Sequence, residues 1–514
     1  MTSRRQLFDN GAVLALRILV VATVCGWLTG CQTPYPCNKR HVVADELQAR
    51  TGTALGSGGG VRTGQVPDGL VVDDGLTADE SVAISLWNNA ALHESLSQLG
   101  VSTGQLFDAG LFADPQFSIF FPIGPKQLEF TTFQAIDALW LRPIRVRAAE
   151  LDLCQLSQQM VQNGLDVARD VRNAHADLVL AQQRAELTND ALELLEQIAE
   201  LAEKRLDAGD ISELEVTTSR IEALRADANA ASAVHNVKLA QQRLRTLMGL
   251  SRPAAQLKAI DDNVGISPIE ADQLVAIALA MRPDLRAAEL QATAAIERAE
   301  LARNQFMNVD VVLDANERGR SGFEAGPGLR MTLPFFNGNR GGIAIADAQV
   351  EVANRRYTTL RDQVELEVRA AHTRLQQADE QQRLIDDRIL PALKTAGELA
   401  RKNYEAGGVP YFLVLQTTGQ FIDARLRRLT ATADLRRATA ELERSVGQRL
   451  DPGEAATDAK EDAGSEAELE TETEVIAGPE LDSSGSESDT ADETRPGSET
   501  SDDQNEERLS RRLR

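Results

Sequence analysis

Residue types that commonly carry out chemistry are few and widely spaced in this 514-residue chain. The histidines form no His-x-x-x-His pair, and no Ser-centred nucleophile elbow or zinc motif is present. The five histidines are His41, His93, His175, His235 and His372. The glycine-rich run 56–60 lacks the Lys-Ser/Thr of a phosphate loop, so it is typical of a flexible linker. The sequence therefore predicts no enzyme activity and no metal site.

One cysteine lies in a motif for lipid attachment. Leu28–Cys31 follows a basic start and an apolar run, and it is typical of a lipobox, in which the cysteine becomes the first mature residue and carries acyl chains. Gln32, rather than an Asp, follows Cys31, which under lipoprotein sorting rules implies the outer membrane. We predict a signal peptide over 1–30 and a palmitate-type lipid on Cys31 as the only cofactor. The alternatives are an ordinary secretory signal and a membrane anchor, for which the run interrupted by Arg17 is too short.

The other cysteines predict at most one disulfide. Cleavage of the leader removes Cys25, and acylation occupies Cys31, so Cys37 and Cys154 are then the only possible pair. They lie in no CxxC motif and beside no histidine cluster, so we expect no redox role for them.

The C-terminal segment is strongly acidic. From Asp451 to Arg514, 21 Asp and Glu face 6 Lys and Arg, so this segment supplies −15 of the formal net charge of −24. It contains no aromatic residue and cannot bury enough apolar surface to form a core. We therefore predict a disordered tail over 449–514, either simply solvated or collecting cations. An acidic chain repels nucleic acid, which we exclude as a partner.

Between these ends the sequence contains two copies of one plan. Landmarks of similar sequence recur at separations of 193 to 198 residues, in the same order. The pairs are Asn89 with Arg282, His175 with His372, Gly209 with Gly407, and Gly249 with Gly447. We assign repeat 1 to residues 76–250, a connection to 251–269 and repeat 2 to 270–448.

Each repeat predicts a helix, a β-hairpin, a very long helix, a glycine-containing turn and another long helix. The first helices are expected over 78–109 and 270–304. In repeat 1, apolar residues of the long helix advance by threes and fours from Leu178 to Leu206, which indicates coiled-coil packing. A helix from Val146 to Leu206 would be roughly 90 Å long. A compact core has no need of that length.

The hairpins, at about 115–140 and 308–336, have the length of membrane strands. They are rich in phenylalanine, and Val309, Val311 and Leu313 share one face. Four strands cannot close a barrel, and an open edge in lipid leaves backbone groups unpaired. Three chains would supply twelve strands. A periplasmic coiled coil with two soluble hairpins is the alternative, but it gives no reason for equivalent hairpins in both copies.

Nearly all of residues 76–447 resembles the TolC-like outer-membrane efflux family. The resemblance is carried by three segments, which are Leu86–Leu92, Arg282–Glu289 and Leu333–Gly341. The resemblance implies a mainly α homotrimer with a shared twelve-stranded membrane β-barrel, four strands per chain, above a long periplasmic α-barrel. Residues 31–75 and 251–269 would form an equatorial layer. Pro283 and Asp284 suit a helix start, so we expect Asp284 to stabilise that terminus.

The resemblance also implies a function. The family's members are passive exit channels that dock a periplasmic adapter and an inner-membrane pump at the end of the α-barrel. The expected contacts lie in the turns 207–213 and 405–411, and they are Gly209, Ser212, Gly407, Val409 and Pro410. The third segment, Leu333–Gly341, resembles members that serve heavy-metal-cation efflux pumps more than it resembles drug-efflux members. The alternative is a periplasmic adapter lipoprotein, which has one helical hairpin and soluble β domains.

A gate is expected inside the same turns. Several relatives have an acidic ring after the second glycine, but Leu413 and Gln416 occupy those positions here. Our hypothesis is that Glu215 and Tyr404 form a polar link between the turns. Glu213 and Asp210 would add negative potential by threefold repetition. The alternative is that these acids only favour the start of a solvated helix.

Overall fold

The computed structural model describes residues 40–56, 66–67, 70, 74–121, 128–250, 257–261, 269–317, 323–406 and 408–450. All of them belong to one compact unit, Met1–Ala455, and the remaining unit is Ala456–Arg514. The predicted signal peptide, the lipid site at Cys31, Cys37 and the acidic tail from residue 451 onward lie outside the described residues. Arg449, which the prediction placed in the tail, is described, and its N–H donates to the carbonyl of Arg50 at 3.0 Å. Cys154 is disulfide-bonded.

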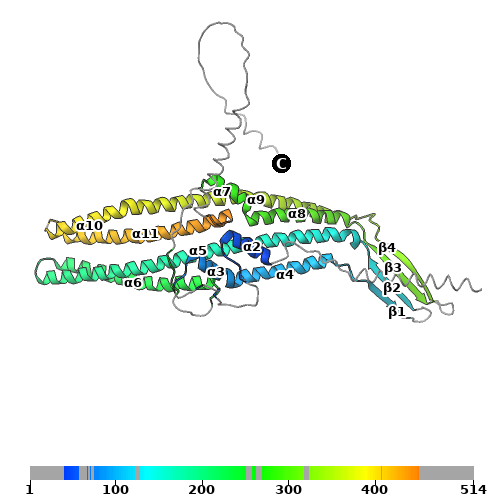
Figure 1. The fold of residues 1–514 in the computed structure, drawn as a ribbon, viewed down its shortest axis with the longest axis horizontal. Coiled ribbons are helices and arrows are strands. Elements are labelled where there is room, and N and C mark those ends of the chain that lie inside the picture. The colour runs from blue at the N-terminus through cyan, green and yellow to red at the C-terminus, as the bar shows by residue number, and fades with distance from the viewer. Residues whose placement is uncertain are drawn as a thin grey trace, which may run out of the picture. The chain divides into compact units, whose positions relative to one another are not determined.

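Long antiparallel helices make up most of the described chain (Figure 1). The first half contains α2 (Arg40–Thr51), α3 (Ala78–Asn88), α4 (Ala90–Gly110), α5 (Ala138–Asp207) and α6 (Glu213–Leu247). The second half contains α7 (Ala271–Met281), α8 (Pro283–Asn304), α9 (Arg340–Leu384), a π-helical turn (Ile385–Ile389), α10 (Leu390–Glu405) and α11 (Tyr411–Val446). At 1.5 Å per residue, the 70 residues of α5 span about 105 Å. Among the described helices, none combines the length and apolar character needed to cross a membrane.

The prediction of a single helix over each of 78–109 and 270–304 is wrong, whereas the predicted helix start at Pro283 is confirmed. Both helices break, the first at Asn89 and the second at Arg282. The Asn89 side chain accepts a hydrogen bond from the N–H of Leu92 at 3.1 Å and so starts a new helix. In the second half Pro283, which lacks an N–H, takes the first helical position.

Each long helical hairpin ends against one of these breaks, and a glycine at its end makes that contact possible. Gly249 (φ +67°) follows α6, and Gly447 (φ +88°) follows α11. A Cβ on Gly249 would lie 2.5 Å from the carbonyl oxygen of Asn88, and one on Gly447 would lie 3.3 Å from the Cα of Arg282. The end of α6 therefore abuts the α3–α4 break, as the end of α11 abuts the α7–α8 break.

The strands form one antiparallel sheet in the order β1-β2-β3-β4. They are β1 (Gln116–Phe120), β2 (Glu129–Ala135), β3 (Val309–Glu317) and β4 (Phe323–Met331). The hairpins of the two halves are joined through β2 and β3. The predicted hairpin ends are wrong, because α5 already begins at Ala138 and β4 ends at Met331, ahead of Pro334. Pro327 lies within β4, which is an edge strand and therefore tolerates a missing N–H.

The register divides the sheet into an apolar and a polar face, because paired residues share a face and successive residues alternate. The apolar face carries Phe117, Ile119, Phe130, Val309, Val311, Leu313, Ala315, Ala325, Pro327, Leu329 and Met331, and its polar members include Thr132 and Gln134. The opposite face includes Asp310 and Asp314. Arg330 pairs with Asp310 at 2.7 Å, and Thr131 donates to Asp314 at 2.8 Å. This confirms the predicted common face of Val309, Val311 and Leu313.

Candidate functional site: the hairpin turns and a buried ion-pair cluster

The turn between α5 and α6 is shaped by a glycine. Gly209 has φ +81°, and the N–H of the next residue, Asp210, donates to the carbonyl of Arg205 at 2.9 Å. This is the C-terminal cap that favours glycine, and a Cβ added at Gly209 would meet no atom within 4 Å. In the other turn Gly408 donates in the same way to Asn403 at 2.8 Å. Gly407 lies outside the described residues.

Glu215 caps its own helix and is not hydrogen-bonded to Tyr404 within the described chain, which corrects the expected link. Its carboxylate accepts from the N–H of Ser212 at 2.9 Å, while the Ser212 hydroxyl accepts from the N–H of Glu215 at 3.3 Å. This reciprocal capping box satisfies the first turn of α6. The sequence Ser-Glu-Leu-Glu from Ser212 to Glu215 has the Ser-x-x-Glu pattern that predicts a capping box.

Tyr404 is instead bound by Arg205 of the other hairpin. Arg205 donates to the Tyr404 hydroxyl, and its guanidinium lies 4.9 Å from the centre of the Tyr404 ring. Tyr411 packs against Tyr404 with ring centres 5.3 Å apart, and burial raises the pKa of its hydroxyl. The contact between the turns therefore consists of one arginine and two tyrosines. Sequence reasoning identified Tyr404 but overlooked Arg205, although Arg205–Gly209 is similar in sequence to Asn403–Gly407.

The remaining predicted residues lie on the surface of the turns. Asp210, Glu213 and Pro410 are exposed, and Val409 is half-buried. Sequence reasoning missed an apolar pair beside them. Leu214 in the first turn of α6 is 75% exposed, and Phe412 in the first turn of α11 is 61% exposed. The two positions lie 198 residues apart, the same separation as Gly209 and Gly407, so the repeat could have revealed them.

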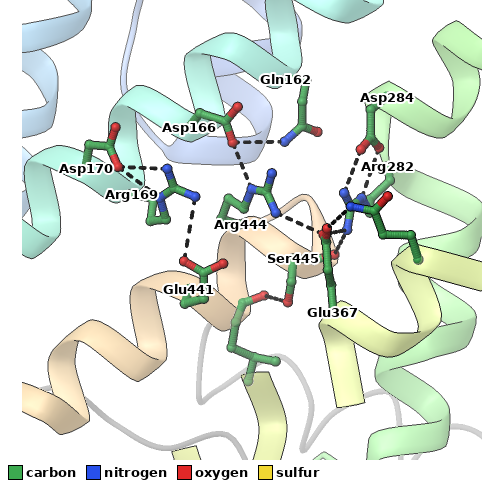
Figure 2. Close-up of polar contacts among 12 residues, drawn as sticks. Gln162, Asp166, Arg169, Asp170, Arg282, Asp284, Glu367, Glu441, Arg444 and Ser445 are labelled. Atoms are coloured by element: carbon green, nitrogen blue, oxygen red, sulfur yellow. Dashed lines mark hydrogen bonds and ion pairs between the residues drawn. The ribbon is translucent and has the colours of Figure 1, made fainter. Parts of the chain in front are cut away.

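A second cluster of polar residues lies where α8 begins (Figure 2). We call Asp166, Arg282, Asp284, Glu367 and Arg444 the ion-pair cluster. Its centre is Arg282, whose side chain is 1% exposed. Arg282 donates to both carboxylate oxygens of Asp284, at 2.9 and 2.6 Å, and to Glu367 at 2.8 Å. Asp284 therefore neutralises a buried arginine as well as lying near the helix terminus.

Arg444 extends the ion-pair cluster to α5. It donates to Asp166 at 2.8 Å and to the same Glu367 oxygen that Arg282 contacts, at 2.9 Å (Figure 2). These two arginines outweigh burial and hold the pKa of Glu367 below its ordinary value. At the neighbouring position on α11, burial raises the pKa of Glu443 although Arg172 contacts it. The ion-pair cluster thus joins α5, α8, α9 and α11 by charge.

Nothing in the ion-pair cluster is arranged for catalysis, because each carboxylate already accepts from an arginine. Within the residues that the structure describes, no group of three or more His, Cys, Asp or Glu side chains could hold a metal ion. The arrangement joins helices; it presents no unpaired acid or base to a substrate.

The comparisons with known proteins agree with this architecture. The family model "Outer membrane efflux protein" matches residues 142–250 and 274–448, more than half of the chain. The cobalt-zinc-cadmium resistance protein CzcC of Cupriavidus metallidurans is 25% identical over 382 residues, which are 73% of this chain and 90% of that protein.

Two solved structures show the same fold. Crystal structures of CusC, described in connection with transmembrane channel formation, match with a TM-score of 0.63 and 17% identity over 72% of this chain and 91% of CusC. The outer membrane protein VceC of Vibrio cholerae matches with a TM-score of 0.60 and 18% identity over 73% of this chain and 97% of VceC. By its family match, its helices and its sheet, this chain belongs to the outer membrane efflux protein family.

Proposed function

We propose that the protein is a passive outer-membrane exit channel of a tripartite efflux or secretion system and functions as a homotrimer. The observation that carries the proposal is the four-stranded sheet, which has an apolar face, a polar face and two outer strands, β1 and β4. Lipid requires every backbone group to be paired, so a sheet with open edges must be closed by further copies. Three chains would form a twelve-stranded barrel with the apolar face toward lipid.

The channel is tested with the purified full chain. We expect a trimer on a denaturing gel that converts to monomer on heating, outer-membrane fractionation, and stable conductance in planar bilayers. A monomer that fractionates with soluble or inner-membrane proteins would overturn the proposal and favour the periplasmic adapter. The fold opposes that alternative, because two long helical hairpins carry one continuous sheet in the described chain.

The two hairpin turns are the proposed docking surface for a periplasmic adapter, which in turn would connect the channel to an inner-membrane pump. Leu214 and Phe412 support this assignment, because each exposes a large apolar side chain beside the expected contacts Gly209, Ser212, Val409 and Pro410. Co-purification of the adapter should be lost in Leu214→Asp/Phe412→Asp, while the trimer band persists. As a control, Thr217→Asp places a charge at an exposed α6 position outside the turn.

We further propose that Arg205 and Tyr404 hold the closed gate, with Glu213, Asp210 and Glu215 supplying negative potential around it. The support is that their contact joins α5 to α10 at the turns. Arg205→Gln and Tyr404→Leu should each raise the open fraction in planar bilayers, and Glu215→Gln should act mainly by weakening the α6 cap. Closed-state conductance identical to wild type in both Arg205→Gln and Tyr404→Leu would contradict this gate.

The lipid anchor on Cys31 is part of the same proposal. Acylation should be detected by metabolic labelling with a palmitate analogue and should disappear in Cys31→Ala. Labelling that persists in that variant would place the lipid elsewhere, and absence of labelling in the unaltered chain would leave an ordinary secretory signal.

For the exported substrate we propose heavy-metal cations, on the basis of the Leu333–Gly341 segment and the similarity to CzcC. A deletion strain should become more sensitive to cobalt, zinc or cadmium salts, and the intact gene should restore resistance. Increased sensitivity to organic drugs with unchanged metal tolerance would contradict this assignment.

A further inference from the structure

Cys154 in α5 is disulfide-bonded, and the chain offers three other cysteines as its partner. They are Cys25, Cys31 and Cys37. Cys25 precedes the proposed cleavage site and is removed with the leader, and the proposed lipid occupies the sulfur of Cys31. In the mature chain Cys37 is therefore the thiol that remains for Cys154.

The helix that follows Cys37, α2, packs along α5 (Figure 1). The Gln158 side-chain amide donates to the Glu46 carboxylate at 3.0 Å. A Cβ on Gly164 would overlap the Leu47 side chain, so this glycine allows α2 to approach α5 closely. The middle of α2 is thus held against the first half of α5.

The last turn of α2 shows the direction in which it runs. The Arg50 carbonyl accepts from the N–H of Arg449 at 3.0 Å, and the Arg449 side chain pairs with Asp79 at 2.9 Å. Asp79 also pairs with Arg172 of α5 at 3.1 Å. The end of α2 therefore lies toward Arg172 and its middle lies beside Gln158, so α2 runs parallel to α5.

This register brings Cys154 level with the start of α2. Carried back along two parallel helices, the contacts in the middle of α2 align Cys154 with a position between residues 37 and 42. α2 begins at Arg40, and the three residues from there to Cys37 span at most about 10 Å. A disulfide requires a Cα separation of about 4.4–6.8 Å. Cys37 can therefore meet Cys154 while the described helices stay in place.

We propose that a disulfide joins Cys37 to Cys154 and attaches the lipidated N-terminus covalently to α5. This inference rests on the proposed function, which places the chain in an oxidising compartment and a lipid on Cys31. The bond forms by exchange with a dithiol oxidoreductase in its disulfide form. One cysteine thiolate attacks that disulfide, and the other attacks the resulting mixed disulfide. Both thiols lose their protons, and the two electrons leave with the oxidoreductase as its dithiol.

The disulfide shortens the connection between the lipid and the fold. Six residues separate Cys31 from Cys37, so the lipidated residue stays within about 20 Å of its attachment on α5. Cys154 lies 16 residues after Ala138, the first residue of α5, which is about 24 Å along the helix. The acyl chains are therefore held close to the level at which the same chain's sheet begins.

A tryptic digest tests whether the lipid is attached to α5. Trypsin cleaves after Lys39, Arg147 and Arg169, so peptide 31–39 contains Cys37 and peptide 148–169 contains Cys154. The purified full chain is labelled with a palmitate analogue, treated with N-ethylmaleimide and digested without a reducing agent. We expect the label on a species that contains peptide 148–169, and we expect reduction to release it as peptide 31–39.

A count of thiols identifies the pair independently. A maleimide reagent coupled to polyethylene glycol should modify no thiol of the denatured mature chain before reduction and two thiols after it. Cys37→Ser and Cys154→Ser should each leave one thiol reactive without reduction. The matched control, Cys37→Ser/Cys154→Ser, should leave none. A reduction-sensitive dimer of the unaltered chain would show a bond between chains and would overturn the proposal.

Trimer formation and conductance of the same preparation separate the two proposals. Conducting, lipidated trimers with a reactive Cys37 would overturn the disulfide alone. Label that separates from peptide 148–169 without reduction would also overturn it alone. A chain that carries no lipid and fractionates with soluble proteins would overturn both the channel and the covalent attachment.

Discussion

At the residue scale, two glycines with similar backbones make different demands on their neighbours. Gly209 and Gly249 both follow a long helix with positive φ, +81° and +67°. A Cβ at Gly209 would meet open space, whereas one at Gly249 would lie 2.5 Å from the Asn88 carbonyl oxygen. The first position therefore requires glycine only for its conformation, and the second requires it for packing as well.

This contrast predicts different stabilities. Gly209→Ala should cost about 1 kcal/mol, the strain of a left-handed alanine, whereas Gly249→Ala should cost about 3 kcal/mol because the helix end must also move from Asn88. Thermal unfolding followed by helical circular dichroism measures both. Equal losses in the two variants would show that the contact with the α3–α4 break contributes little.

The ion-pair cluster gives a second prediction, on pH. Because Arg282 and Arg444 lower the folded pKa of Glu367, ionised Glu367 stabilises the fold above the ordinary carboxyl value of about 4.3. Glu367→Gln should therefore cost about 2 kcal/mol at neutral pH, less than a fully buried pair because Glu367 is partly exposed. The difference in the free energy of unfolding between wild type and Glu367→Gln should narrow as the pH falls below about 4.3 and through the lowered folded pKa of Glu367.

Glu443→Gln is the matched control for this pH dependence. Burial raises the folded pKa of Glu443, so its ionised form opposes folding and its protonation at lower pH stabilises the wild type. Glu443→Gln should leave the free energy of unfolding unchanged or raise it slightly at neutral pH. As the pH falls, the wild type should become more stable relative to this variant. Parallel pH curves for the two variants would contradict the assigned directions.

At the element scale, local patterns predicted the helices of the two repeats and the strands, but not their ends, and they did not predict α2. The heptad-like stripe anticipated α5, and alternation anticipated β3. The helix starts at Asn89 and Pro283 have local causes, but the packing of Gly249 and Gly447 against them joins segments that are distant in sequence and could not be predicted. The ion-pair cluster could not be predicted for the same reason, since its residues are brought together only by the fold. The contact between Arg205 and Tyr404 likewise spans two hairpins.

The two faces of the sheet give a prediction at this scale. Leu313 and Val312 are neighbours in β3 but point to opposite faces, Leu313 to the apolar one. Leu313→Arg should cost about 2–4 kcal/mol if that face contacts lipid, whereas Val312→Arg should be tolerated because its face is polar. The yield of heat-modifiable trimer in the outer membrane measures the difference. Similar yields for the two variants would place both faces in water.

At the scale of the whole molecule, the edges of the sheet would determine how chains associate in the proposed trimer. In the sheet order, β1 and β4 each have one strand neighbour, and β1 runs antiparallel to β4. Closure by rotation would therefore pair β4 of one chain with β1 of the next, and the repeated use of one such contact gives a ring. Ile119 and Leu329 lie on these outer strands, on the apolar face that would surround the barrel.

This geometry predicts covalent trapping of the ring. Ile119→Cys combined in turn with Ala325→Cys, Leu329→Cys or Met331→Cys samples the possible registers, since all of these residues lie on one face. One combination should bring its cysteines within the roughly 4.4–6.8 Å Cα separation that a disulfide requires, because residues paired across neighbouring strands lie at about that spacing. Mild oxidation should then give a trimer that withstands heating until it is reduced.

Val312→Cys with Ile119→Cys is the control, because Val312 lies on an inner strand and the opposite face, so its cysteine should not link chains. A ladder extending beyond trimers would indicate open association through the same edges, and absence of cross-linking in every register would show that another element covers them.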